Sequence, residues 1–486
     1  MNRLMTAISA FSARSTKGRR PVLVAFSMLV ALAIFAVSHR IASHLAAESA
    51  LLEGVLTETP SAMAIADLFA IVLLCGGLLV VAPAMTAAQV GEERRSGTLD
   101  LLRTAPLSPT QLVAGFVAGA PSSLYLLLVG PFALHVVAGL TGGLPLQAMG
   151  ESIVLLIAGS IALMLLCTLA SLSVGREAAG VGGPLILTGL LAIFGLITVG
   201  MSTEASSSTW AHLHPAGAIS ALYRSFAGPY RSAVCNVWCR ARFEEPEVAS
   251  LSLIAPVFAA LVYLAGGALL LVATRRALAG ETASRLHKME AIGLFTVAVV
   301  AILVPMRIVI DPRSLDQGTA AGSAFALVLP YLACVIGATP SATAYGAGRA
   351  RALSPASAPL LSALLMLAIG IAIGLLLYGR ALLTTFEEAH RSGAMVGFVL
   401  LALTAPIYSL YSATRLSGSA ARLGFWALVG THMVLQVPVI ASFMHGGNGW
   451  SSTLCEAGLA LGVLVPSIVM WRQIVTDRRL KARAVC

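Results

Sequence analysis

Charged residues are scarce in this chain of 486 residues, with Asp, Glu, Lys and Arg together making up 11%. Soluble domains carry about 25% charged residues, so the sequence lacks the polar surface that a water-soluble globular protein needs. Hydrophobic residues make up 58%, and the mean hydropathy is +0.90. This composition is typical of a membrane protein and excludes a soluble globule.

Lysine is rarer still, with only Lys17, Lys288 and Lys481. A phosphate-binding P-loop needs a Gly-rich turn followed by Lys and then Ser or Thr, and neither residue follows any of the three lysines. The sequence also shows no nucleophile–base pair and no paired catalytic carboxylates. We therefore expect no enzyme activity and no cofactor in this chain.

Apolar runs of about 20 residues recur along the whole chain, which is the length that a helix needs to cross a bilayer. Backbone groups in lipid must be satisfied internally, so these runs predict helices, and their continuous hydrophobicity argues against a β-barrel. We predict an all-α polytopic membrane protein with about twelve transmembrane helices, at residues 21–38, 63–89, 112–138, 150–174, 181–201, 250–273, 290–310, 323–345, 357–379, 394–414, 423–444 and 454–471.

Lys and Arg gather in alternate connections between these runs. If the N-terminus lies in the cytoplasm, most of the 31 basic residues fall on the cytoplasmic side, as the positive-inside rule requires. An even number of spans then places both termini in the cytoplasm, and we expect the membrane to be the bacterial inner membrane. Basic side chains facing the lipid bilayer account for much of the net charge of +10, so we expect no nucleic-acid partner.

The stretch GEERRSGTLDLLRTAPLSPTQ, residues 91–111, is a densely charged connection between the second and third predicted spans. The Ser-Gly pair at 96–97 is expected to end the helix of the second span. Residues 98–105 predict a short helix with Leu99 and Leu102 on one face. We expect the leucines of this helix, Leu101 included, to be exposed on the cytoplasmic side, or alternatively to lie on the lipid surface.

A second helix start follows within the same stretch. Pro106 ends the short helix, because proline cannot continue the hydrogen-bond pattern. Ser108 is then placed to be an N-cap, with Pro109 at the first helical position and Gln111 at the third, as in a capping box. The third span is therefore expected to begin here.

This stretch resembles the first cytoplasmic loop of ABC-2-type permeases, the membrane subunits of one class of ATP-driven exporters. The resemblance covers about 20 of the 486 residues, and its matching positions are Glu92, Glu93, Arg94, Gly97, Thr98, Leu99, Asp100, Leu101, Leu102, Pro106, Leu107 and Ser108. In that family the loop is a coupling helix that docks on a separate ATP-binding subunit, which holds ATP and Mg. The resemblance implies that the first ten positions contact this partner. One departure is Gly115-Phe116, where the family often has a Gly-Lys pair.

An internal similarity suggests a repeat. PAMTAAQVGEER at 83–94 aligns with PSATAYGAGRAR at 340–351, and the later copy lacks a counterpart of 96–106. Family permeases usually have six spans, so twelve suggest two six-helix ABC-2-like halves in tandem, although short Ala/Gly/Pro-rich sequences also align by chance. If the repeat is real, the second half is expected to contact the ATP-binding subunit less.

The predicted domain organisation follows from the repeat. It comprises a cytoplasmic tail at 1–20, a first six-span half at 21–288 and a degenerate second half at 289–486, which ends in a basic cytoplasmic tail. The first half contains the coupling loop 91–111 and the largest exterior loop, 202–249. The two-half interpretation favours one chain as both permease halves, and pairing with a second permease chain is the alternative.

The exterior loop contains side chains of the kinds that ligate zinc or copper, namely His212, His214, Cys235 and Cys239. We favour instead an exterior cap without metal, whose amphipathic segment GAISALYRSF (217–226) lies in the membrane interface. A disulfide between Cys235 and Cys239 is an open alternative if the exterior is oxidising.

Four ionisable residues lie within or at the edges of predicted spans: Asp67, His135, Glu290 and His432. Such residues are candidates for function by default. Asp67 and Glu290 lie near span ends, so we expect them to be solvated. The two lone histidines are expected to be packing residues with satisfied hydrogen bonds.

Three functions are compatible with these patterns. The first is the permease of an ABC exporter. The second is a twelve-span secondary transporter driven by an ion gradient, which would need buried ionisable groups that this sequence has few of. The third is a non-transporting membrane scaffold. No residue in the sequence selects a transported substrate.

Overall fold

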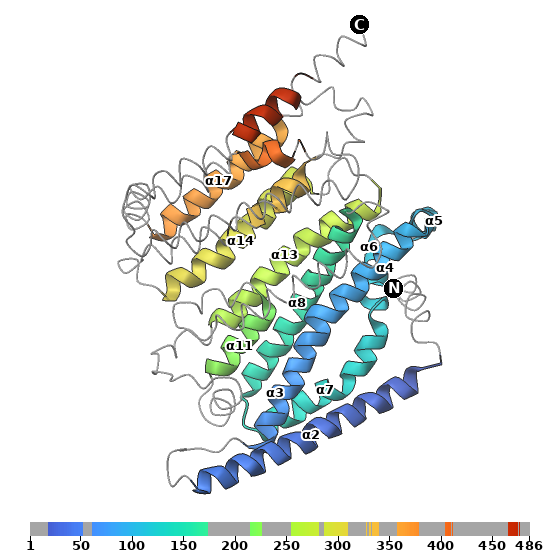
Figure 1. Cartoon of the computed structure of the whole chain (residues 1–486), viewed down its shortest axis with the longest axis vertical. Helices are drawn as coiled ribbons and strands as arrows, with labels where there is room; N and C mark the ends of the chain where they lie inside the picture. The colour runs from blue at the N-terminus through green and yellow to red at the C-terminus, as the bar shows by residue number, and fades with distance from the viewer. Residues whose placement is uncertain are drawn as a thin grey trace. The chain divides into compact units, whose positions relative to one another are not determined.

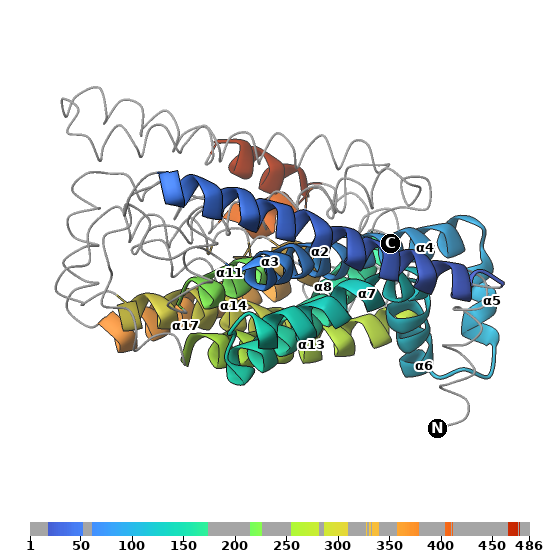
Figure 2. The same ribbon diagram turned by 90° about the horizontal axis from the view of Figure 1, so that it is seen from below.

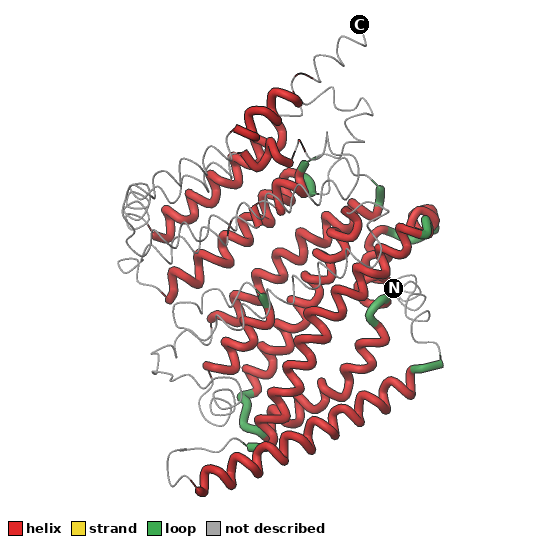
Figure 3. The backbone as a smooth tube through the Cα atoms, in the orientation of Figure 1, coloured by secondary structure: helices red, strands yellow, loops and turns green. Residues whose placement is uncertain are grey.

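The computed structural model describes residues 18–51, 61–173, 214–225, 254–280, 286–309, 327, 330–331, 333–339, 357–378, 404–409, 411, 465–474 and 476. Within these ranges every regular element is a helix and no strand occurs (Figure 3). The predicted all-α class is thereby confirmed. The chain divides into two compact units, residues 1–280 and 281–486.

Seven helices in the described part of the chain are long and apolar enough to cross a membrane. They are Arg20–Ala47, Ala62–Arg95, Ser122–Thr141, Leu146–Leu172, Val257–Leu278, Lys288–Pro305 and Leu361–Tyr378. These helices coincide with seven of the predicted spans and identify the chain as an integral membrane protein. The other five predicted spans lie wholly or mainly outside the described residues.

The first unit is built from the spanning helices and short helices between them (Figure 1). In chain order these are α2 (Arg20–Leu51), α3 (Ala62–Cys75), η1 (Gly76–Val81), α4 (Ala82–Arg95), α5 (Thr98–Thr104), α6 (Pro109–Ala114), η2 (Gly115–Gly119), α7 (Ser122–Thr141), α8 (Leu146–Ser173), α11 (Pro215–Ser225) and α13 (Ile254–Leu278). α8 packs against α13 and α4, and α7 packs against α2 and α3. In the second unit, α14 (Lys288–Val309) packs against α17 (Ser357–Tyr378).

The elements α3, η1 and α4 form one continuous span, which α5 and α6 follow at one end of the unit (Figure 2). α11 lies toward the other end, beside α8 and α13 (Figure 1). Because α11 begins beside Gly159 in the middle of α8, the short helix predicted between the second and third spans is separated from α11 by the second half of α8.

Pro131 lies inside α7, where a proline leaves the carbonyl four residues earlier without its helical donor. That carbonyl belongs to Leu127, and the Ser27 hydroxyl of α2 donates to it at 2.7 Å. Ser27 Oγ in turn accepts from the Gly130 N–H at 2.7 Å. A Cβ at Gly130 would lie 2.2 Å from the Ser27 carbonyl oxygen, so only glycine permits this approach of the two helices.

A similar arrangement stabilises the second span at the π-helix η1. The Ala82 N–H bonds to the Gly77 carbonyl five residues earlier, and Pro83 next to it has no N–H to continue that pattern. The carbonyl that Pro83 leaves without a donor is that of Leu78, five residues earlier. The Ser160 hydroxyl of α8 donates to this carbonyl at 2.8 Å. A neighbouring helix thus replaces the donor that proline removes, as membrane helices require.

The π-helix η2 ends in the same way before Pro121. The carbonyl four residues before this proline belongs to Val117, and the Tyr125 hydroxyl donates to it at 2.9 Å. Three prolines in the first unit are therefore each matched by a hydroxyl-bearing side chain.

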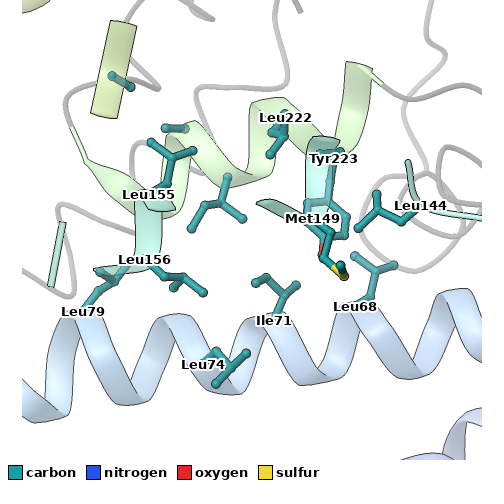
Figure 4. Packing of buried hydrophobic residues seen from close by; sticks show 14 of the residues in the cluster. Leu68, Ile71, Leu74, Leu79, Leu144, Met149, Leu155, Leu156, Leu222 and Tyr223 are labelled. Atoms are coloured by element: carbon teal, nitrogen blue, oxygen red, sulfur yellow. The ribbon is translucent and has the colours of Figure 1, made fainter. Parts of the chain in front are cut away.

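The core of the first unit is apolar and connects α3, α8 and α11 (Figure 4). Its labelled members are Leu68, Ile71, Leu74, Leu79, Leu144, Met149, Leu155, Leu156, Leu222 and Tyr223. Lipid tails are as apolar as these side chains, so close packing and interhelical hydrogen bonds must hold the helices together. Gly159 of α8 illustrates the closeness, because a Cβ there would lie 2.2 Å from Pro215 Cγ of α11.

Candidate functional site

The local structure predicted for residues 91–111 is confirmed in detail. α4 ends at Arg95, and Gly97 adopts a left-handed conformation with φ of +76°, which glycine tolerates without strain. The short helix α5 follows at Thr98–Thr104, within one residue of its predicted end. A turn at 96–97 therefore separates α5 from the second span.

The helix start predicted at Ser108 is confirmed, but the helix that begins there, α6, is short, and the third spanning helix begins only at Ser122. Ser108 Oγ accepts from the Gln111 N–H at 3.3 Å, and the Gln111 side chain accepts from the Ser108 N–H at 2.8 Å. Pro109 occupies the first helical position. This reciprocal capping box fixes where α6 begins.

One side of α5 is fastened to the end of α4. Leu99 is buried with 3% of its surface exposed, and Glu93 is buried with 5% exposed. The Glu93 carboxylate accepts from Gln89 Nε2 at 2.7 Å and from the Thr98 hydroxyl. The expectation that Leu99 is exposed was wrong, because this leucine is buried on the side of α5 that faces the unit.

Two arginines fasten the same region to the ends of other spans. Arg94 Nη1 donates to the Ser171 carbonyl near the end of α8 at 2.7 Å. Arg103 donates to the Leu278 and Ala277 carbonyls at 2.9 and 3.1 Å. The last carbonyls of a helix have no intrahelical donor, so Arg103 satisfies the end of α13 and places its positive charge at the negative end of the helix dipole.

The opposite side of α5 faces away from the unit. Leu101 is 69% exposed, Asp100 is exposed and pairs with Arg103 at 2.9 Å, and Leu102 is half-buried. Nine of the ten residues predicted to contact a partner therefore fall into two groups. The anchoring group is Glu93, Arg94, Gly97, Thr98 and Leu99, and the outward group is Glu92, Asp100, Leu101 and Pro106. The tenth, Leu102, is half-buried and lies on the same face of α5 as Leu99.

A second cluster lies in the core of the unit, and we call it the Asp67 network. His135 Nδ1 lies 2.6 Å from Asp67 Oδ1, and His135 Nε2 lies 3.2 Å from Ser152 Oγ. The Tyr223 hydroxyl donates to Asp67 Oδ2 at 2.9 Å. Asp67, His135 and Ser152 are fully buried and Tyr223 is 2% exposed. The expectation that Asp67 is solvated was wrong, whereas His135 is satisfied at both nitrogens as expected.

Acid, imidazole and hydroxyl follow one another in this network as in a hydrolase triad. Neither Ser152 nor His135 exposes any surface, so a substrate cannot reach the hydroxyl in this structure. The network was missed at the sequence level because its members lie on four different helices, and only the rule that intramembrane ionisable groups have partners pointed to it.

His214 is a buried cap at the start of α11. Its Nδ1 accepts from the Ala216 N–H at 3.2 Å, and burial lowers the pKa of His214 to about 4. A neutral ring suits this position, since a cation at a helix N-terminus is unfavourable. The apolar residues of α11 pack in the protein core, where the sequence had suggested a helix lying in the membrane interface.

Glu290 caps the start of α14 in the second unit. Its carboxylate accepts from the His287 N–H at 2.7 Å, and it is 8% exposed. The expectation of a solvated position was wrong here too, because the carboxylate turns back onto a helix N-terminus, where negative charge is favourable.

Several predicted features lie outside the described residues, namely His212, Cys235, Cys239, His432 and the later copy of the repeat at 340–351. Among the residues that are described, no group of three or more His, Cys, Asp or Glu side chains is placed to hold a metal ion.

Scans of the chain against protein-family models, curated proteins and solved structures found no match in any of the three. A function for this chain therefore rests on its own residues and their geometry.

Proposed function

We propose that this chain is the membrane-spanning permease subunit of an ABC exporter, and that α5 docks on a separate ATP-binding subunit. The observation that carries the proposal is the two-sided character of α5. Its buried side is fixed by Leu99 and Arg103, while Leu101 is 69% exposed at the opposite side. A large exposed apolar side chain on a firmly held helix suits a contact with another protein.

Firm attachment is what a coupling element needs. Arg103 of α5 bonds to the end of α13, and Thr98 of α5 bonds to Glu93 near the end of α4, so a displacement of α5 acts directly on the ends of two spans. A solvated connector would need neither bond. The charged outward residues Glu92 and Asp100 add polar contacts at the rim, which favour specificity over affinity.

The proposal assigns membrane transport to this chain and ATP binding to its partner. The partner binds ATP and Mg, because this chain has no Lys followed by Ser or Thr for a P-loop. The positive-inside pattern supports a bacterial inner-membrane location with both termini in the cytoplasm, so α5 faces the cytoplasm. We also propose that one chain supplies both permease halves.

Site-directed photocrosslinking tests the docking. A photoreactive amino acid is placed at the exposed Leu101 and, as a matched control, at Arg95, which is exposed at the end of α4. We expect the Leu101 adduct to contain a P-loop protein, identified by its peptides in mass spectrometry, and to form at least severalfold faster than the Arg95 adduct. Probes at 349–355 should give few such adducts. Absence of a P-loop protein from the Leu101 adduct would contradict the proposal.

A second candidate function is an ion-gradient-driven transporter, and the buried Asp67–His135 pair favours it. Buried ionisable groups are the usual elements of proton pathways in such proteins. The chain alone, in liposomes with an imposed pH gradient, would then carry a proton flux that His135→Gln abolishes. Equal flux in empty liposomes would exclude this candidate.

A further inference from the structure

α11 lies inside the first unit although it is too short to cross a membrane. It has 11 residues, which at 1.5 Å per residue is about 16 Å, and the hydrocarbon core of a bilayer is about 30 Å thick. It begins beside Gly159 in the middle of α8. Near its other end, Tyr223 bonds to Asp67 near the start of α3. α11 therefore runs from the middle of the unit toward the helix ends that lie away from α5 (Figure 1).

The two ends of α11 are held in different ways. At the deep end the contact is apolar and very close, because a Cβ at Gly159 would lie 2.2 Å from Pro215 Cγ and 3.6 Å from a methyl group of Leu79. At the other end, the Tyr223 hydroxyl donates a hydrogen bond of 2.9 Å to Asp67 Oδ2. Water can replace a hydrogen bond when a helix end moves outward, but it cannot replace close apolar packing.

The end of α11 that carries Tyr223 lies over the Asp67 network. A Cβ at Gly139 would lie 3.5 Å from Asp67 Oδ1 and 3.5 Å from Leu144 Cδ2, so the network is close to the connection between α7 and α8, which contains Leu144. Leu144 is 3% exposed, Met149 is 7% exposed, and both lie beside Tyr223 (Figure 4). Apolar side chains and the Tyr223 ring thus surround the network on the side of this connection.

We propose that α11 is a gate over the Asp67 network, and that the Tyr223–Asp67 hydrogen bond is its latch. In the open state, the end of α11 with Tyr223 moves away from α3, while Pro215 stays against Gly159 as the pivot. The Tyr223 hydroxyl then bonds to water, and water reaches Asp67. With α5 in the cytoplasm, the gate opens to the exterior.

The arrangement of bonds around Asp67 suits a latch. The two carboxylate oxygens have different partners, with His135 Nδ1 at 2.6 Å from Oδ1 and the Tyr223 hydroxyl at Oδ2. When Tyr223 leaves, Asp67 keeps its contact with His135, so the buried carboxylate is not left without a partner. The latch contributes only the small net free energy of one hydrogen bond, because water takes its place in the open state.

Hydrogen exchange of the purified full-length chain in lipid nanodiscs, at one fixed pH, tests the latch. Tyr223→Phe removes its hydroxyl. The matched control is Tyr125→Phe, because the Tyr125 hydroxyl also donates a single 2.9 Å bond to a carbonyl, that of Val117, outside the network. We expect exchange of 215–225 to rise roughly tenfold in Tyr223→Phe, the factor that corresponds to the loss of one hydrogen bond. Tyr125→Phe should leave this segment as in wild type.

The exchange of α3 and α8 distinguishes a gate from a bond that only stabilises the bundle. If α11 opens by itself, exchange at 64–74 and 155–165 stays at the wild-type rate in Tyr223→Phe. An equal rise in α3, α8 and α11 would overturn the proposal, and so would an unchanged α11.

A cysteine beneath α11 tests whether opening admits water to the network. Met149→Cys places a thiol beside Tyr223, and a charged maleimide that does not enter lipid labels it, with the labelled peptide identified by mass spectrometry. We expect labelling to be roughly tenfold faster when Tyr223→Phe is added and unchanged when Tyr125→Phe is added. The native Cys167, fully buried in the second half of α8, should stay unlabelled in the Tyr223→Phe protein.

Two outcomes of the labelling would overturn the gate. One is a Met149→Cys rate that Tyr223→Phe does not change, and the other is labelling of Cys167 that rises in parallel, which would mean that the whole unit loosens. Neither experiment uses an ATP-binding subunit, so failure here leaves the proposed docking of α5 untouched.

Discussion

Arg103 Nε donates a hydrogen bond of 2.9 Å to the carbonyl oxygen of Leu278, across 175 residues of sequence. This bond makes the end of one span dependent on a helix only seven residues long. It also explains why α5 keeps a fixed position although it lies in a connection between spans. A connection held in this way can transmit a displacement, which a flexible loop cannot.

Removal of this bond should loosen both helix ends. Arg103→Ala is expected to lower the free energy of local opening at 98–104 and at the end of α13 by about 1 to 3 kcal/mol, because two carbonyls lose a charged donor. Hydrogen exchange at both segments measures the change. The matched control is Arg95→Ala, since Arg95 is 63% exposed and pairs only with Glu92 in the ion pairs described here. Equal exchange in both variants would show that the Leu278 bond has no anchoring role.

Ser27 should contribute more to the free energy of unfolding than an ordinary serine in a membrane helix. Ser27→Ala leaves the Leu127 carbonyl and the Gly130 N–H without their partner and is expected to cost about 1 to 2 kcal/mol. Gly130→Ala should cost more, because its Cβ would meet the Ser27 backbone. Unfolding of the purified chain in mixed micelles gives both values. Ser43→Ala, at an exposed position of the same helix, is the control. If Ser43→Ala lowers the free energy of unfolding as much as Ser27→Ala, the stabilising role of the Ser27 bonds to Leu127 and Gly130 is refuted.

Acid should weaken the start of α11. The pKa of His214 falls from 6.5 to about 4 on burial, so between these values the unfolded segment binds a proton that the folded one excludes. The stabilisation is complete above about pH 6.5 and is lost as the pH falls toward 4. Hydrogen exchange of 214–225 measured downward from neutral pH should show this loss.

His214→Asn provides the control for the acid response. Asparagine keeps an acceptor for the helix start but does not titrate, so the acid-induced loss of protection should disappear. If His214→Asn and wild type respond alike, His214 is not the titrating group.

Local signals in the sequence were reliable where a few neighbouring residues decide the structure. The break at 96–97, the short helix and the Ser108 capping box all follow from chemistry within one or two turns. The apolar runs likewise predicted the spans that the structure describes. The two π-helices were not predicted, because they depend on how Pro83 and Pro121 are accommodated, by Ser160 of a neighbouring helix and by Tyr125 of the following turn.

Contacts between distant segments could not be read from the sequence. Leu99 and Leu101 are both leucines two residues apart, and only the packing of α5 on the unit makes one an anchor and the other exposed. Asp67 and His135 each looked like an isolated residue near a span end. Their 2.6 Å contact requires the packing of α3 against α7, which a pattern of hydrophobic residues does not specify.

The ATPase activity of the complex with and without Leu101→Asp tests the central claim most directly. Leu101 is 69% exposed, so the substitution should leave α5 folded, which hydrogen exchange at 98–104 verifies. If α5 is the docking helix, Leu101→Asp should reduce co-purification of the ATP-binding subunit and its stimulated activity at least tenfold. Wild-type co-purification and stimulated activity in a folded Leu101→Asp protein would contradict the assignment.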